Sequence, residues 1–124
     1  MFLTLLQVAL GGAIGACLRH LANIGVGRAL GVGFPFGTFI VNVSGSVLMG
    51  MLVVTLAKVG ENRLAPFLMT GLLGGFTTFS AFSLDAATLW ERGEAGLAFV
   101  YVAGTVCLSL AGIAAGHWLA RQWI

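Results

Sequence analysis

The 124-residue chain carries very little charge: only 8% of its residues are charged, and only four of these are acidic. A soluble domain contains about a quarter charged residues. Hydrophobic residues make up 59% of the chain instead, and the net charge of +2 is small and dispersed. These values exclude an ordinary soluble domain, give no basic surface for a nucleic-acid partner and indicate an integral membrane protein.

Groups that could perform catalysis or bind a metal are also scarce. His20 and His117 lie near the ends of different apolar runs, and the hydroxyl residues have no nearby base. Cys17 and Cys107 each lie within an apolar run, where we expect small buried residues and neither a disulfide nor a metal site. The sequence therefore predicts that the protein is not an enzyme.

Long apolar runs are what the chain does contain. A membrane-spanning helix needs roughly 20 residues, and four such runs occur at about residues 2–24, 36–57, 65–90 and 95–119. We predict an all-α membrane protein in which residues 1–124 form one domain of four transmembrane helices. No basic segment or small-residue cleavage site marks the first run as a signal peptide, so we expect it to be retained.

The third run contains a segment that disfavours a helix. Gly74 and Gly75 are followed closely by two β-branched residues, Thr77 and Thr78. Unwound backbone is tolerated at membrane depth only where it is buried in protein or lines a polar cavity or ion site. We therefore predict that the third helix is broken at 74–78, near the midplane, and that the other spans shelter the break.

Polar residues recur every four positions in two other runs, which places them on one face of each helix. The second run has such a stripe around Asn42, and the fourth has Tyr101, Thr105 and Ser109. Asn42 either forms an interhelical hydrogen bond or lines a pore. Arg19, near the end of the first run, either reaches the membrane interface or supplies a cation at the mouth of an anion path.

Basic residues give the chain no preferred orientation. With four spans, equal numbers lie on the two sides of the membrane: Lys58, Arg63 and Arg121 against Arg19, Arg28 and Arg92. Dual topology, in which both orientations are inserted, follows as a hypothesis, and two inverted copies would form an antiparallel homodimer. Carbonyl groups exposed at two facing helix breaks would suit a hard cation such as Na⁺.

The polar residues of the spans favour an anion as the conducted species. The spans contain no carboxylate before Asp85, whereas hydroxyl and amide donors, which solvate anions, are frequent. Phe79 and Phe82 share a helical face and could turn their positive ring edges toward an anion. From the residues alone, packing is the commoner role for such a pair.

Three motifs together resemble the small microbial fluoride channels called Fluc or CrcB: GGAIGACLR at 11–19, GTFIVN at 37–42 and TGLLGGFTTFSAFS at 70–83. The resemblance covers nearly the whole chain. It implies an antiparallel, dual-topology homodimer in the cell (inner) membrane that exports fluoride passively and so lowers cytoplasmic fluoride and its toxicity. It also implies a structural Na⁺ at the dimer centre that is not transported.

The resemblance also implies roles for particular residues. The backbone carbonyls of Gly74 and Thr77 would bind Na⁺, and Arg19 would be a vestibule cation. The pore would be lined by Phe79, Phe82, Asn42, Ser80, Ser83, Tyr101, Thr105 and Ser109. The sequence departs from the family pattern at Ala81, where Thr is frequent, at Asp85, where Glu is common, and at Thr105, which replaces a Ser seen in some relatives.

Two alternative functions stay open. A small multidrug-resistance-like antiporter has a similar length and dual topology, but it uses an acidic residue in the first span. Here the first acidic residue is Glu61, in an expected loop. A non-conducting membrane assembly subunit would use the small-residue stripes for packing alone and would tolerate Phe79→Ile.

Overall fold

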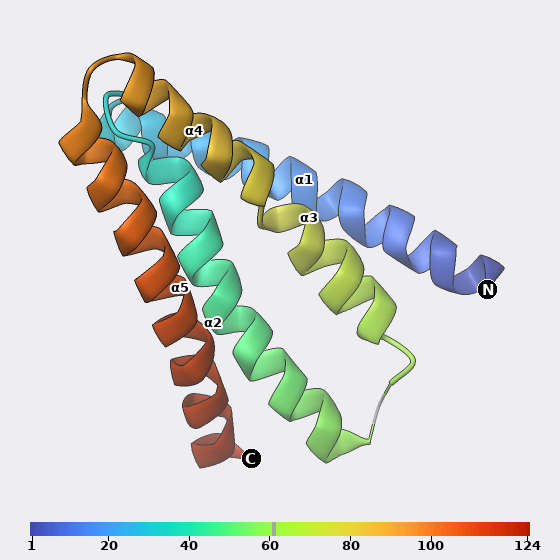
Figure 1. Ribbon diagram of the computed structural model, residues 1–124. Coiled ribbons are helices and arrows are strands. Elements are labelled where there is room, and N and C mark those ends of the chain that lie inside the picture. The colour runs from blue at the N-terminus through green and yellow to red at the C-terminus, as the bar shows by residue number, and fades with distance from the viewer. Residues whose placement is uncertain (61) are drawn as a thin grey trace.

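The computed structural model describes residues 1–60 and 62–124, whose regular structure is entirely helical (Figure 1). The helices are α1 (Phe2–Leu30), α2 (Phe36–Val59), the π-helix η1 (Pro66–Leu73), α3 (Gly74–Phe76), α4 (Phe79–Glu91) and α5 (Ala95–Trp123). Four segments are long and apolar enough to cross a membrane, namely Phe2–Leu30, Phe36–Val59, Pro66–Glu91 and Ala95–Trp123. The predicted all-α architecture with four spans is confirmed. Glu61, expected in a loop, lies outside the described residues.

The first and last spans are longer than predicted. α1 continues through Gly25 and Gly27 to Leu30 instead of ending near residue 24, and α5 reaches Trp123. A glycine weakens a helix by about 1 kcal/mol, which does not end a long helix while its φ stays negative. α1 ends only at Gly31, where φ is 83° and a residue with a Cβ would be strained.

The third span leaves the helical conformation later than predicted. Gly74 and Gly75 are still helical, as part of α3, and only Thr77 (φ −89°, ψ 158°) and Thr78 (φ −156°, ψ 123°) are extended. Gly75 is needed for close packing, because an added Cβ would lie 2.6 Å from the carbonyl oxygen of Gly12. The β-branched threonines suit extended backbone. The location of this segment at the membrane midplane stays a prediction.

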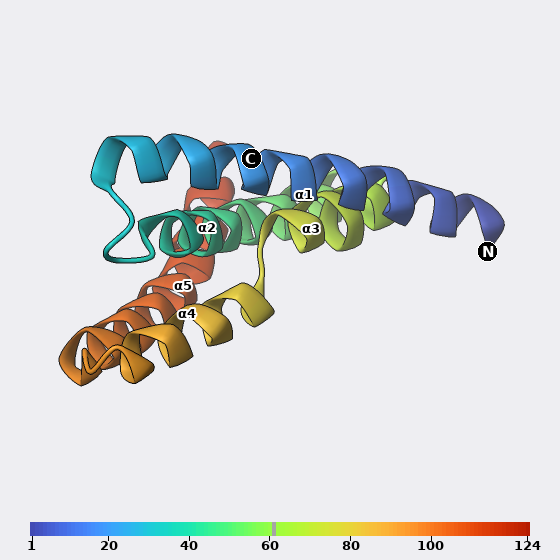
Figure 2. The same ribbon diagram turned by 90° about the horizontal axis from the view of Figure 1, so that it is seen from above.

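The helices pack along two seams. α1 lies beside η1 and α3, whereas α5 lies beside α2, and α4 contacts α5 (Figures 1 and 2). Glycines bring the backbones close in both seams: a Cβ on Gly11 would overlap the carbonyl oxygen of Phe67, and one on Gly116 would overlap that of Val47. Such contacts are typical of helix packing in membranes. α2 joins the two seams, because it contacts α1 and η1 as well as α3 and α4.

The two short connections between spans lie at the same end of the molecule (Figure 1). Arg92 joins them, because its Nη2 donates to the carbonyl oxygen of Gly33 at 2.9 Å and contacts a carboxylate oxygen of Glu94 at 2.6 Å. Successive spans therefore run in opposite directions. The count of basic residues on each side of the membrane assumed this course of the chain.

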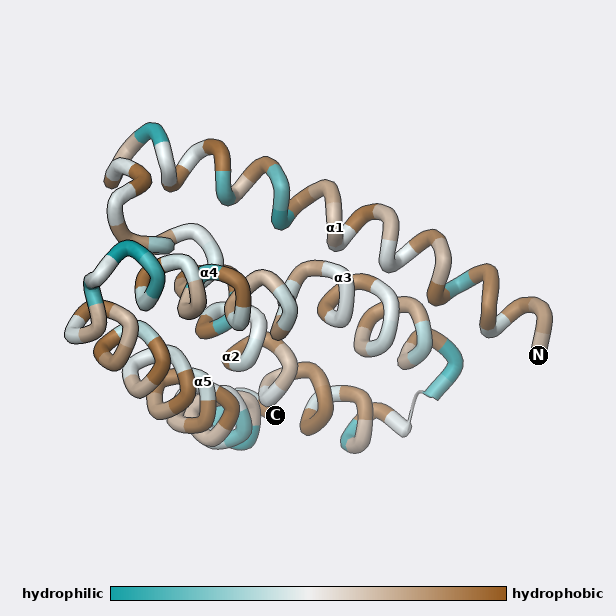
Figure 3. The backbone as a smooth tube through the Cα atoms, turned by 45° about the horizontal axis from the view of Figure 1, so that its top comes forward, coloured by the Kyte–Doolittle hydropathy of each residue, from teal (hydrophilic) through white to brown (hydrophobic). Residues whose placement is uncertain are grey.

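Many large hydrophobic residues are exposed, and α1 contributes a long series of them. Hydrophobic residues recur along the whole of α1 in Figure 3. Cys17 and Cys107 are exposed as well, so the expectation that both are buried is wrong. A chain of four spans buries only a narrow stripe of each helix, and residues beside that stripe face outward. An apolar surface of this extent marks contact with lipid or with another chain.

Candidate functional site

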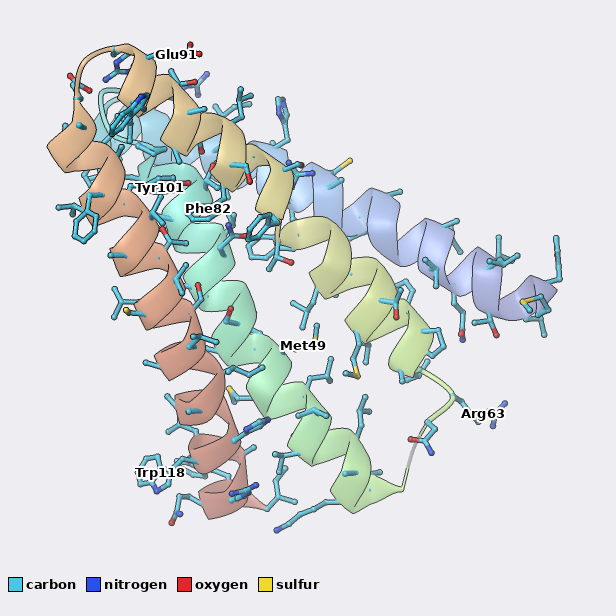
Figure 4. All side chains as sticks on the ribbon, in the orientation of Figure 1. Met49, Arg63, Phe82, Glu91, Tyr101 and Trp118 are labelled. Atoms are coloured by element: carbon cyan, nitrogen blue, oxygen red, sulfur yellow. The ribbon has the colours of Figure 1, made fainter. Side chains whose placement is uncertain are left out.

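A groove of about 390 Å³ opens beside the α3–α4 connection. Its walls come from α2, from the extended pair Thr77 and Thr78, from the start of α4 and from the middle of α5. Figure 4 shows Phe82 on the side of α4 that faces α2 and α5, and Met49, also in the lining, further along α2. The groove brings together most of the predicted pore residues: Asn42, Phe79, Phe82, Thr105 and Ser109. None of its described lining residues is charged.

The Asn42 side chain holds the extended backbone from α2. Its Nδ2 donates to the carbonyl oxygen of Thr78 at 2.9 Å, and its Oδ1 accepts from the Thr78 N–H at 2.8 Å. The amide therefore satisfies both backbone groups of a residue that has left the helix. Of the two roles considered for Asn42, the interhelical bond is present. The residue also lines the groove and keeps a second N–H on Nδ2.

The hydroxyl groups around the start of α4 serve the local backbone. Thr78 caps the helix, since its Oγ1 accepts from the N–H of Ala81 at 3.1 Å, and it lies 3.2 Å from the Ser80 hydroxyl. Ser83 donates to the carbonyl oxygen of Phe79 at 3.0 Å. Ser80 and Ser83 are not among the described residues that line the groove, although both are predicted pore residues.

Phe79 and Phe82 form an edge-to-face pair at the groove, with ring centroids 5.4 Å apart and an interplanar angle of 66°. Their surroundings differ: Phe82 is 7% exposed, whereas Phe79 is 77% exposed. Phe82 also contacts the ring of Tyr101, with centroids 5.2 Å apart. The Phe82 ring is thus packed inside the chain, while the Phe79 ring projects from its surface.

The predicted stripe on α5 divides into two parts. Tyr101 is fully buried, does not line the groove and donates its hydroxyl to Oδ2 of Asp85 at 3.1 Å. Thr105 and Ser109 line the groove, and their hydroxyl oxygens are buried without a hydrogen-bond partner among the described residues. A buried hydroxyl without a partner costs about 1–3 kcal/mol. Two of them in one groove indicate a place for a polar ligand.

The carbonyl groups near the helix break have distinct partners. The Leu73 oxygen accepts from the N–H and the hydroxyl of Thr77, at 3.0 and 2.9 Å, and the Gly75 oxygen accepts from Nε of Arg19 at 3.1 Å. The Gly74 and Thr77 oxygens accept no hydrogen bond within the ranges that the structure describes. These two free carbonyls are the predicted Na⁺ ligands. No group of three or more metal-binding side chains occurs in the same ranges.

Two features of the site were not predicted. The bond from Arg19 to Gly75 joins residues 56 positions apart, and the bond from Tyr101 to Asp85 joins residues on different helices. Periodicity places residues on a face of one helix but does not show which helices pack together. The sequence contained one signal for these contacts, namely Arg19, because a charged side chain within an apolar span requires a partner.

Comparison with known proteins decides the family. The family described as "CrcB-like protein, Camphor Resistance (CrcB)" matches residues 6–117. The chain belongs to this family. A protein named "Fluoride-specific ion channel FluC" from Cereibacter sphaeroides is 65% identical over 124 residues, which cover 100% of this chain and 99% of that protein. A protein of the same name from Paracoccus denitrificans is 58% identical over 118 residues, 95% of this chain and 94% of the relative.

The family assignment confirms the resemblance stated from the motifs. It is a family of ion channels and not of enzymes, and the chain is a multi-pass membrane protein. The antiporter alternative has no support from the relatives. It also lacks the residue it requires, because α1 contains no Asp or Glu.

Proposed function

We propose that this protein is a fluoride-specific channel that exports fluoride passively across the cell (inner) membrane. The observation that carries the proposal is the pair of buried hydroxyls of Thr105 and Ser109, which line the groove without a partner in the described chain. A partly dehydrated anion accepts hydrogen bonds from such donors. The names of the relatives, at up to 65% identity over the full chain, support fluoride as the anion.

The groove offers hydrogen-bond donors to an anion, and none of its described lining residues carries a competing charge. Thr105, Ser109 and the remaining N–H of Asn42 can donate, and the edge of the Phe82 ring carries partial positive charge. The nearest acidic residue along α4, Asp85, accepts the Tyr101 hydroxyl and does not line the groove. A narrow path of small donors and ring edges favours a small anion over a larger one such as chloride.

A passive path is sufficient for export. An inside-negative potential drives an anion outward by about 2.3 kcal/mol per charge per 100 mV. Selectivity against chloride is required, because an unselective anion leak would depolarise the membrane. The path therefore needs no coupling ion and no acidic residue that takes up and releases protons.

The proposal includes a homodimer of two oppositely oriented protomers, with the third helix broken near the membrane midplane. Three basic residues lie on each side of the spans, so neither orientation is favoured. Phe79 is 77% exposed although it lines the groove, which suits a surface completed by a second protomer. Gly74, in the last helical turn before the extended Thr77 and Thr78, is exposed as well.

A structural Na⁺ that is not transported completes the proposal. The Gly74 and Thr77 carbonyls of each protomer would hold it, because they accept no other hydrogen bond from the described residues. Carbonyl oxygen is a hard ligand suited to Na⁺. When bound, the ion would neutralise the partial negative charge of the facing carbonyls and join the two protomers.

Fluoride efflux from proteoliposomes tests the channel directly. The vesicles contain potassium fluoride or potassium chloride, valinomycin balances charge, and an ion-selective electrode records release. We expect fast fluoride release without chloride release. No fluoride release from monodisperse, Na⁺-loaded protein would contradict the proposal and favour the non-conducting assembly subunit.

Substitution of the groove aromatics separates the same two functions. Phe82→Ile should reduce fluoride efflux at least about tenfold, a barrier change of about 1.4 kcal/mol, while the protein stays monodisperse. Leu84→Ile, on the same helix and exposed, is the matched control. Full fluoride efflux in a folded Phe82→Ile variant would show that this ring does not contribute to the conduction path.

A further inference from the structure

Arg19 is bonded to the backbone of the helix break. Its Nε donates to the carbonyl oxygen of Gly75 at 3.1 Å from a partly buried position. Because Thr77 and Thr78 are extended, the last carbonyls of α3 lack their usual helical partners. A guanidinium group supplies a donor for one of them, and its positive charge suits the C-terminal end of a helix.

The packing of α1 determines where the Arg19 side chain can reach. A Cβ on Gly15 would overlap the carbonyl oxygen of Leu72 and lie 2.8 Å from the backbone nitrogen of Phe76. α1 therefore cannot rotate or slide along the third span without a backbone overlap. Arg19 follows Gly15 by one helical turn on the same face, so this close packing brings its guanidinium group to Gly75.

We propose that Arg19 is a positioning residue for the ion site at the helix break. By holding the Gly75 carbonyl, it fixes the backbone on which the Gly74 and Thr77 carbonyls lie and keeps these two free for Na⁺. The inference rests on the proposed function and deepens it. It differs from the role of a vestibule cation, which would act on fluoride through charge alone and without a particular hydrogen bond.

The dependence of flux on ionic strength separates the two roles. A charge that attracts fluoride from solution is screened, because the Debye length falls from about 10 Å at 0.1 M to about 3 Å at 1 M salt. A hydrogen bond that fixes backbone geometry is not removed in this way. The measurement is fluoride efflux from proteoliposomes for wild type, Arg19→Ala and Arg19→Lys, in N-methylglucamine gluconate from 0.05 to about 1 M.

We expect Arg19→Ala to reduce fluoride efflux at least about tenfold at every ionic strength. Arg19→Lys keeps a charge and a donor but not the planar guanidinium group, so its efflux should lie between that of Arg19→Ala and that of wild type. Arg28→Ala, which removes an exposed cation from the same helix, is the control and should match wild type at high salt. Convergence of both Arg19 variants with wild type at about 1 M salt would overturn the inference.

Titration with sodium gluconate gives a second readout. Bound Na⁺ should raise the melting temperature, and Arg19→Ala should need a higher Na⁺ concentration than wild type for half of this rise and for half-maximal efflux. A vestibule cation would leave both concentrations unchanged. An unchanged value would overturn the inference. If neither the melting temperature nor the efflux of wild type depends on Na⁺, the proposed Na⁺ site and this inference both fail, while the channel proposal still stands on fluoride efflux. Should Arg19→Ala not fold, Arg19→Lys carries both tests.

Discussion

α1 and α2 both contact the helix break, and they do so by different means. α1 approaches through glycine and touches backbone: a Cβ on Gly75 would lie 2.6 Å from Gly12 O and 3.2 Å from the backbone nitrogen of Ala16. α2 approaches through a side chain, the Asn42 amide, which binds both backbone groups of Thr78. The α1 contact fixes where the third span lies, and the α2 contact fixes the conformation of its extended residues.

This difference explains why the groove lies on the α2 side. Backbone-to-backbone packing leaves no room between α1 and α3. On the α2 side the contacts run through side chains, namely the Asn42 amide on Thr78 and the Thr77 methyl group against Gly45, and the groove is lined by α2, α4 and α5. We therefore predict that substitutions of α1 glycines will affect folding, whereas substitutions on the α2 side of the third span will affect conduction.

The largest effect is expected for Gly15→Ala. The new Cβ would overlap the carbonyl oxygen of Leu72, a backbone atom that cannot move alone, so α1 must separate from the third span. We expect a loss of stability at the upper end of the ~1–3 kcal/mol that overpacking costs. Thermal melting and size-exclusion chromatography in detergent measure it. Gly25→Ala, where a Cβ would contact nothing within 4 Å, is the matched control and should be as stable as wild type or up to about 1 kcal/mol more stable, because alanine favours the helix.

Asn42→Ala should have the next largest effect on stability and a larger one on conduction. It removes two hydrogen bonds from Thr78, and such bonds within membranes contribute about 0.6 kcal/mol each on average, so we expect a loss of about 1–2 kcal/mol. Fluoride efflux should fall at least tenfold, on the order of 1.4 kcal/mol, because the extended backbone is no longer held. Ser44→Ala, which removes only hydrogen bonds within α2, to the carbonyl oxygens of Ile40 and Val41, is the control. Wild-type efflux in Asn42→Ala would contradict this account of α2.

Gly45→Ala places a clash on the α2 side of the third span, where Gly15→Ala places one on the α1 side. Its Cβ would meet the methyl group of Thr77, a side-chain atom that can rotate away at the expense of the Thr77 hydroxyl bond to Leu73. We expect a smaller loss of stability than for Gly15→Ala, below about 1 kcal/mol, but a measurable change in flux. A stability loss as large as that of Gly15→Ala would show that α1 and α2 constrain the break equally.

The four spans could be predicted from the sequence because a long apolar run forms few structures other than a membrane-spanning helix. It also indicated the helix break, since Gly74 to Thr78 is a poor helical sequence, although close packing against α1 keeps Gly75 helical and confines the extended backbone to the threonines. The groove could be predicted only in part. The four-residue spacing found Thr105 and Ser109 together with Tyr101, but it could not show that Asp85 pairs with the tyrosine and leaves the other two hydroxyls without a partner.

We propose that the buried hydroxyls of Thr105 and Ser109 are ligands of the conducted anion. The most direct test is fluoride efflux from the Thr105→Val/Ser109→Ala double variant, with its melting temperature measured on the same preparation. Because the hydroxyls have no partner within the described protomer, their removal should leave stability equal to or above that of wild type. The account predicts reduced fluoride efflux at an unchanged or higher melting temperature. Wild-type efflux in the stable double variant would contradict it.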